Sequence, residues 1–328
     1  MELLTTAELT ALGLTKACLD TAVRRGELVR ERRGVFSFPE GIDAGADVDA
    51  VQRHLADVAA ELRSRPAWLA ARRSAALVHQ LPIIGQTPPA RPQLLLPQTD
   101  VRTRPEDRHH RINRVPEDQQ VIEQDLPCSS LARTAVDLAR TESFRNGVCA
   151  LDGVLGRGVT SEEVLGVLGG MRRWPGATRA RVALQLADGR SESLLESLSR
   201  VSVHQLGLPA PEPQLEVWLG EQFLARVDFG WEELGTLGEA DGLAKFGDEA
   251  VDREKSFASM RDRQAWLEDV GFIVVRWGWN DAWRPKGVLD DRLLRAFARA
   301  EGRRLDPRVR LVRTTVADRL ARDRRTAA

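Results

Sequence analysis

The fold of the C-terminal third of this chain is decided by residues 215–242, which read LEVWLGEQFLARVDFGWEELGTLGEADG. Two β-strands are expected over Leu215–Leu219 and Phe223–Phe229, because Gly220-Glu221-Gln222 between them favours a hairpin. A third strand is expected over Leu237–Asp241. The flanking elements are a helix over residues 191–205, a helix over 253–269 and a strand over 272–276. The predicted order is therefore helix, three strands, helix, strand.

Acidic side chains are concentrated on these strands. Glu239 and Asp241 are two residues apart, which places both on one face of a strand, and Asp228 lies near the end of the preceding strand. If the two strands pair in hairpin order, Asp228 and Glu239 converge on one ion. Carboxylates are ligands of Mg²⁺ or Mn²⁺, and such an ion polarises a phosphate and acidifies a water in phosphodiester hydrolysis. Lys245 is expected to orient that water or to neutralise charge on the phosphate.

The same segment resembles the PD-(D/E)XK nuclease superfamily, and more narrowly its very-short-patch-repair-like branch. The matching residues are Ser193, Glu196-Ser197, Gly207-Leu208-Pro209, Pro213-Gln214, Arg226-Val227-Asp228-Phe229, Glu239-Ala240-Asp241-Gly242, Lys245-Phe246, Glu254-Lys255, Arg261-Asp262 and Val275-Arg276. The resemblance implies a restriction-endonuclease-like αβββαβ core in which Asp228 and Glu239 bind the metal, with Glu196 of the first helix as a further acidic ligand. The superfamily has a lysine two residues after the glutamate, where this chain has Asp241. Either Lys245 replaces that lysine, or the domain is a degenerate scaffold that binds without cutting.

Two simpler interpretations apply to residues of this segment. Glu192, Glu196 and Arg200 lie on the side of their helix away from its leucines, so a solvated helix face accounts for them as well. The tryptophans near its end either stack on nucleic-acid bases or close the core of a small domain, and the core is the commoner use of such residues. These tryptophans are Trp277, Trp279 and Trp283.

The N-terminal segment has the order of a winged helix-turn-helix. A helix ending at Leu12, a second helix from Thr15 to about Arg25 and a basic two-stranded hairpin over 28–38 follow one another. It resembles the winged helix of AbiEi-type antitoxins, carried by Leu9, Leu19, Gly26, Leu28, Arg32-Arg33-Gly34-Val35 and Phe36. The residues expected to contact DNA are Lys16, Arg24, Arg25, Arg30, Arg32 and Arg33. The alternative is a winged helix that binds a protein.

The middle segment is predicted to be mostly helical. Helices are expected over residues 47–62, 67–79, 130–140, 146–155, 160–171 and 177–186, with a short strand over 93–96. Residues 130–138 resemble the serine-capped Arg-Thr…Asp helix of the second AbiEi domain. Arg133 and Asp137 within it are interpreted as a surface pair at i, i+4 spacing, worth only tenths of a kcal/mol.

Composition excludes several classes of protein. The chain has 328 residues with 48 basic and 48 acidic side chains, and no apolar run approaches the ~18 residues of a membrane span. Its three cysteines are scattered, and we expect neither a disulfide framework nor a zinc site. The start of the chain shows no secretory leader, which favours the cytoplasm. Charge is segregated, with fourteen basic and six acidic residues after residue 283.

These observations predict a multidomain chain that combines α+β and α/β architecture. The expected domains are a winged helix-turn-helix at 1–45, an AbiEi-like helical domain at 46–188, a nuclease-like domain at 189–284 and an Arg-rich amphipathic helix with an irregular tail at 285–328. The expected function is metal-dependent cleavage of DNA. The alternative is an antitoxin-like repressor, or a protein that binds a toxin or another partner, with an inactive nuclease scaffold. Action on RNA stays open, and the sequence predicts no particular oligomeric state.

Overall fold

A computed structural model describes the chain in two compact units. The units are Met1–Ala187 and Asp188–Ala328, and the boundary falls one residue before the expected start of the third domain. Both units combine helices with β-sheets, so the protein belongs to the α+β class. The described residues are 3–6, 16, 19–20, 23, 29–32, 35–37, 48–64, 67–85, 87–95, 115–241 and 263–326.

A three-stranded antiparallel sheet lies near the N-terminus. Strands β2 (Val29–Arg32) and β3 (Val35–Ser37) pair as the expected hairpin, and the order in the sheet is β1-β3-β2. Strand β1 (Leu3–Thr5), which pairs with β3, was not predicted, since three residues carry no recognisable alternation. Residues 16, 19, 20 and 23 are helical.

The rest of the first unit joins a four-stranded sheet to a group of helices. The sheet has the order β5-β4-β7-β6. Its strands are β4 (Leu69–Ala70), β5 (Leu94–Leu95), β6 (Gln120–Glu123) and β7 (Leu126–Ser129). The helices are α3 (Val48–Ser64), α4 (Arg72–Val78), α5 (Leu131–Thr141), α6 (Phe144–Leu155), α7 (Ser161–Gly169) and α8 (Ala177–Leu186), with a 3-10 turn at Glu117–Gln119.

The predicted helix over residues 67–79 is wrong in its first part. Leu69 and Ala70 pair with β5 and β7, and the helix begins only at Arg72. Pairing with strands far away in sequence overrides local helix propensity there. The β6–β7 hairpin was not predicted either, because its turn uses Gln124 and Asp125 in left-handed conformations (φ 50° and 59°) that glycine usually supplies.

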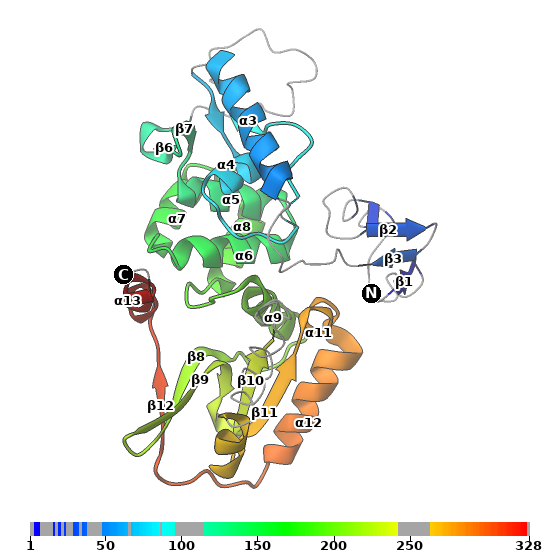
Figure 1. The fold of residues 1–328 in the computed structure, drawn as a ribbon, viewed down its shortest axis with the longest axis vertical. Helices are drawn as coiled ribbons and strands as arrows, with labels where there is room; N and C mark the ends of the chain where they lie inside the picture. Colours follow the sequence, from blue (N-terminus) through cyan, green and yellow to red (C-terminus); the bar gives the residue numbers. More distant parts are fainter. Residues whose placement is uncertain are drawn as a thin grey trace. The chain divides into compact units, whose positions relative to one another are not determined.

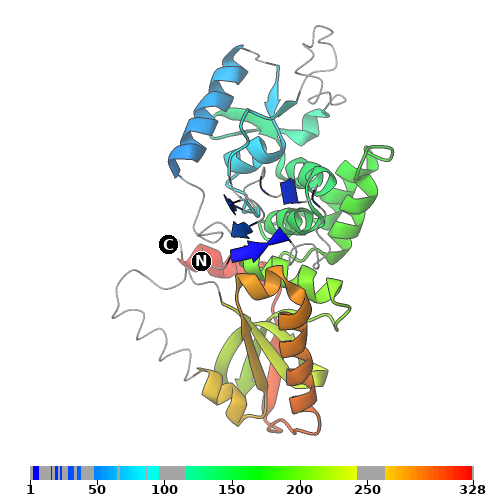
Figure 2. The same ribbon diagram turned by 90° about the vertical axis from the view of Figure 1, so that its right-hand side faces the viewer.

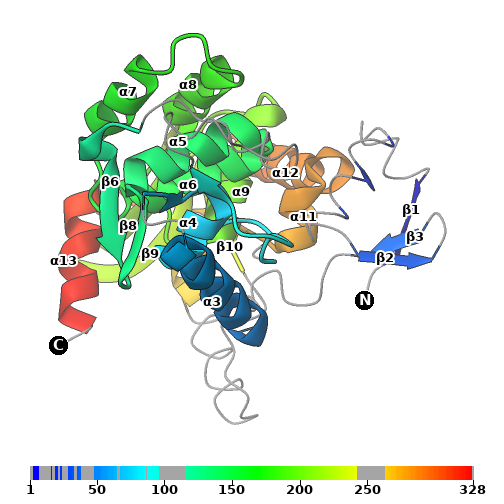
Figure 3. The ribbon, with the colours of Figure 1, turned by 90° about the horizontal axis from the view of Figure 1, so that it is seen from above.

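Helix α5 packs against α6, α7 and α8 (Figure 3). Ser130 caps α5 by accepting a hydrogen bond from the backbone N–H of Arg133, as predicted. Thr160 and Glu163 form a capping box at the start of α7. A Cβ at Gly147 would lie 2.9 Å from Cα of Ala139, so this glycine lets α6 approach α5 closely.

The pair of Arg133 and Asp137 is buried, so its interpretation as a surface pair was wrong. The two side chains are 2% and 0% exposed, and the Nε–Oδ2 distance is 2.8 Å. Asp137 also accepts from Arg140 at 2.9 Å, and both guanidinium groups lie over the ring of Trp174. Helical spacing alone gives no information on which face is covered.

The second unit is built on a five-stranded mixed sheet with the order β11-β10-β9-β8-β12 (Figure 1). Only β10 and β11 run parallel within it. The strands are β8 (Glu212–Leu219), β9 (Gln222–Trp231), β10 (Thr236–Ala240), β11 (Ile273–Trp277) and β12 (Val309–Arg313). The helices are α9 (Leu194–Gln205), α11 (Trp279–Trp283), α12 (Asp290–Ala300) and α13 (Val316–Thr326), with single turns at Glu232–Leu234 and Pro285–Leu289 and helical residues at 263–269.

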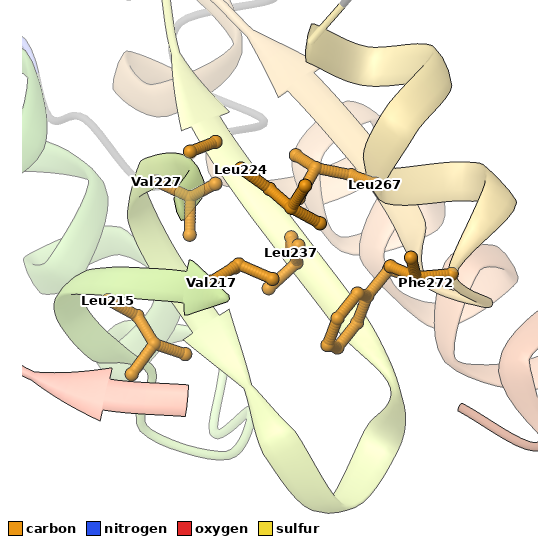
Figure 4. Packing of buried hydrophobic residues seen from close by; sticks show 9 residues of the cluster. Leu215, Val217, Leu224, Val227, Leu237, Leu267 and Phe272 are labelled. Carbon is orange, nitrogen blue, oxygen red and sulfur yellow. The ribbon is translucent and has the colours of Figure 1, made fainter. Parts of the chain in front are cut away.

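Apolar side chains from this sheet and from the helical residues 263–269 form a shared core (Figure 4). Leu224 and Leu237 from the strands lie beside Leu267 and Phe272, and Leu237 and Phe272 are fully buried. Helix α12, orange in Figure 2, runs along the sheet and packs on β11 and β10. This core fixes the strands that carry the acidic residues.

Trp277 belongs to the core, which confirms the commoner of the two interpretations for this residue. Its ring is 2% exposed and stacks on Phe229 with the ring centroids 5.4 Å apart. Its indole N–H donates to the hydroxyl of Ser199 in α9 at 2.8 Å.

The prediction of an irregular C-terminal tail was wrong. Residues 309–313 form β12, which pairs along its whole length with β8, and residues 316–326 form α13. The five residues of β12 read Val-Arg-Leu-Val-Arg, which has no regular alternation of apolar and polar positions, so the sequence showed no strand period there. No helix in the described ranges is long and apolar enough to cross a membrane.

Candidate functional site

Asp228 lies where the antiparallel ladder of β9 and β10 ends. The last pair of this ladder is Gly238 with Phe229, and the same register extended by one position brings Asp228 opposite Glu239. There the strands are joined by a side chain, because Oδ2 of Asp228 accepts from the backbone N–H of Ala240 at 2.7 Å. Ala240 directly follows Glu239 in the sequence. The structure therefore places Asp228 against the part of β10 that carries Glu239.

Glu196 of α9 is a buried acid beside Asp228. Its side chain is 2% exposed and accepts from the Ser193 hydroxyl at 2.8 Å, the Glu192 backbone N–H at 2.8 Å and the Gln214 amide at 2.9 Å. Burial, followed by the negative charge of Asp228, raises the pKa of Glu196 to about 7. The three hydrogen bonds act in the opposite direction by stabilising the carboxylate. Glu196 and Asp228 are therefore two acids in mutual repulsion.

The interpretation of Glu192, Glu196 and Arg200 as one solvated helix face was wrong for Glu196 and Arg200. Glu196 and Arg200 are 2% and 7% exposed. Glu192 precedes the helix. Its carboxylate accepts hydrogen bonds from Nη1 and Nη2 of Arg226 in β9, at 2.6 and 2.9 Å. Glu196 and Arg200 thus face protein, while Glu192 stays about one-third exposed beside a strand residue that sequence spacing does not reveal.

Glu239 and Asp241 have different surroundings. Glu239 is half-buried and lies beside Arg276 in the parallel register of β10 and β11. Asp241 follows the end of β10, and its carboxylate accepts from Nη1 of Arg276 at 2.7 Å. Arg276 therefore neutralises the Asp241 carboxylate, which a metal ion would otherwise have to do. Lys245 lies outside the described residues.

The fit of these residues to a divalent cation is partial. In the parts of the chain that the structure describes, no three His, Cys, Asp or Glu side chains lie together as a metal-binding group. Two features nevertheless suit a cation: the raised pKa of Glu196 next to Asp228, and the position of Glu239 at the end of the same ladder. An ion would offset the repulsion between buried Glu196 and the half-buried acids beside it. Asp228, Glu239 and Glu196 are the residues that would hold it.

The residues predicted to contact DNA are only partly described. The side chains of Lys16 and Arg30 are exposed. Arg30 lies on β2 and forms an ion pair with Asp20 at 2.7 Å, so the two side chains together carry no net charge. Arg32 is the last residue of the same strand. Arg24, Arg25 and Arg33 lie outside the described residues.

Two residues important to the site were missed as functional residues. Gln214 donates to Glu196 and is itself in a left-handed conformation (φ 53°), which is uncommon for a residue with a side chain. Arg276 holds Asp241. The signal for Arg276 was available, because the predicted strand over 272–276 ends in this arginine. When that strand pairs with β10 in parallel, its arginine lies beside the acids of β10.

The fold defines a two-unit α+β protein whose second unit carries paired acids at the end of a strand ladder. No model of a known protein family matches the chain. It is similar to two Mycobacterium tuberculosis proteins, uncharacterized protein MT2308 of strain CDC 1551 / Oshkosh and uncharacterized protein Rv2248 of strain ATCC 25618 / H37Rv, each 30% identical over 172 residues. The match covers 52% of this chain and 61% of each relative's length.

Proposed function

We propose that the second unit hydrolyses DNA phosphodiesters with a bound Mg²⁺ or Mn²⁺ ion, and that the N-terminal segment with its three-stranded sheet binds DNA as a winged helix. The observation that supports this most is the burial of Glu196 beside Asp228, which raises the pKa of Glu196 to about 7. A buried acid beside a second acid costs free energy unless a cation or a proton lies between them. The order of elements and the sequence resemblance to PD-(D/E)XK nucleases favour the cation.

Each residue has a defined part in this proposal. Asp228, Glu239 and Glu196 hold the ion, which supplies polarisation of the phosphate and acidification of a water when it is bound. Gln214 and Ser193 orient the Glu196 carboxylate by donating to it. Lys245 stays the proposed cation for the water or the phosphate.

The test is incubation of the purified full chain with supercoiled plasmid in Mg²⁺, in Mn²⁺ and in EDTA. Cutting is expected with the metals only, and Asp228→Asn or Glu239→Gln should lower the rate on the order of 100-fold or more. Glu221→Gln is the matched control, because Glu221 is an exposed acid in the β8–β9 turn of the same unit. Cutting that persists in the Asp228→Asn, Glu239→Gln double variant would dismiss this site.

A second candidate function is favoured by one contact. Arg276 neutralises Asp241 at the position where the nuclease pattern has its lysine. An antitoxin-like repressor or partner-binding protein with an inactive scaffold would show this substitution. It predicts sequence-specific binding to its own promoter in a gel-shift assay, with no cutting of plasmid or of RNA in any metal.

A further inference from the structure

Two arginines share one carboxylate next to the candidate site. Arg226 of β9 binds both oxygens of Glu192, and Nη2 of Arg322 in α13 reaches Oε1 of the same carboxylate at 3.2 Å. The three side chains are 27%, 32% and 28% exposed, for Arg226, Glu192 and Arg322 respectively, so solvent and solutes reach them. The group carries one net positive charge, and removal of the carboxylate would leave two.

This group is held in place by contacts that do not depend on Glu192's side chain. Arg319 of α13 donates to the backbone carbonyls of Gly189, at 2.7 Å, and of Ser191. Arg226 lies in a strand that pairs with β8. The backbone segments that carry Arg226 and Arg322 would therefore stay in place if the Glu192 side chain moved away.

The group is also adjacent to the proposed catalytic acids. Arg226 is two residues before Asp228 on β9, so both lie on one face of the strand, roughly 7 Å apart along it. The backbone N–H of Glu192 donates to Glu196. A phosphate bound by these arginines would belong to the DNA strand that enters the candidate site.

We propose that Arg226 and Arg322 form a phosphate clamp for the DNA backbone, and that Glu192 occupies this clamp until DNA displaces it. The two-point bond from Arg226 to a carboxylate has the geometry that arginine also uses with phosphate. Besides Arg322, α13 carries three arginines against two aspartates, which adds positive potential beside the clamp. The proposal rests on the proposed DNA-binding function and assigns its substrate-binding residues.

The test measures DNA binding in EDTA, which separates it from cleavage. The full chain is titrated into a fluorescein-labelled duplex DNA of mixed sequence, and anisotropy is followed over a series of salt concentrations. Glu192→Gln should tighten binding on the order of 3- to 10-fold at low salt and steepen the log–log salt slope by about 1. Arg322→Gln should weaken binding and make that slope shallower by about 1.

The control removes an equivalent carboxylate elsewhere in the unit. Asp306 is bonded by Nε and Nη2 of Arg308 at 3.0 and 2.8 Å, so Asp306→Asn releases an arginine with the same change in net charge. It should alter DNA affinity less than 2-fold, since Arg308 has no place in the proposed clamp. Equal tightening by Asp306→Asn and Glu192→Gln would reduce the effect to net charge and overturn the clamp.

Stability is checked for every variant by its unfolding temperature. If Glu192→Gln unfolds, the salt slope of Arg322→Gln decides, and an unchanged slope overturns the proposal. Tightening on duplex RNA alone would replace DNA as the partner and also overturn it. A chain that shows the expected clamp behaviour without cutting plasmid would retain the clamp while the nuclease proposal fails.

Discussion

The carboxylate of Asp228 accepts a hydrogen bond from the backbone N–H of Ala240 at 2.7 Å, at the point where the β9–β10 ladder ends. An acid that replaces a strand carbonyl in this way is fixed in position by the backbone of the neighbouring strand. The Asp228 side chain is therefore ordered by the sheet itself, and the fold holds its carboxyl group beside Glu196.

Asp228→Asn keeps an acceptor oxygen for Ala240 but removes the charge. We expect this variant to fold and to have a lower pKa at Glu196. The proposed metal site predicts that Mg²⁺ raises the unfolding temperature of the unmodified chain but not that of Asp228→Asn. Thermal unfolding with and without Mg²⁺ measures this effect. An Mg²⁺-dependent rise in Asp228→Asn equal to that in the Glu221→Gln control would show that the ion binds elsewhere.

Stability in the absence of metal should fall as the pH rises from about 4.5 to about 7. Because the pKa of Glu196 is raised from 4.5 to about 7, the native state keeps a proton in this window that the unfolded chain has released. The corresponding loss is at most about 3 kcal/mol. Urea unfolding of the unmodified chain and of Glu196→Gln at several pH values checks this, and parallel pH profiles would contradict it. Mg²⁺ should reduce the loss, since the ion favours ionised ligands.

Asp137→Asn should destabilise the first unit by about 3–5 kcal/mol. Asp137 bonds Arg133 and Arg140 in a place where it is fully buried, and its loss leaves two guanidinium charges without their counter-ion. Urea unfolding measures the change. Asp291→Asn is the control, because its pair with Arg295 is exposed and has the same helical i, i+4 spacing as Arg133–Asp137. A cost under about 0.5 kcal/mol is expected for Asp291→Asn, and similar costs for both variants would contradict the role of burial.

Gly176→Ala should cost more than about 2 kcal/mol. Gly176 has φ 79°, a conformation that costs other residues about 1–2 kcal/mol, and its Cβ would lie 2.1 Å from the carbonyl oxygen of Arg140. The opposite sign is expected for Gly166→Ala in α7, where a Cβ meets nothing within 4 Å and alanine favours the helix by roughly 0.5–1 kcal/mol. Differential scanning calorimetry of both variants provides the comparison.

Local pattern predicted much of the fold. The hairpin of β8 and β9, the strands β10 and β11 and the helices α5 and α7 agree with the expected elements. Two of the failures share one cause. The short β4 and the edge strand β12 are strands because of partners distant in the chain, and no window of a few residues contains those partners.

The candidate site divides in the same way. The positions of Asp228 and Glu239 follow from the strand period and from the hairpin order, which the sequence shows. The burial of Glu196 and the ion pair of Asp241 with Arg276 do not, since each depends on which element packs beside the acid.

By itself, then, the sequence determined the strand and helix periodicities and the order of the acids along the second unit, because backbone geometry imposes periods of 2.0 and 3.6 residues on local neighbours. Only the tertiary structure decided which charges meet. Glu192 and Arg322 are 130 residues apart in the chain, and they come within hydrogen-bonding distance because β12 joins the sheet and carries α13 with it. Contacts of that separation arise from packing and register, which no local pattern encodes.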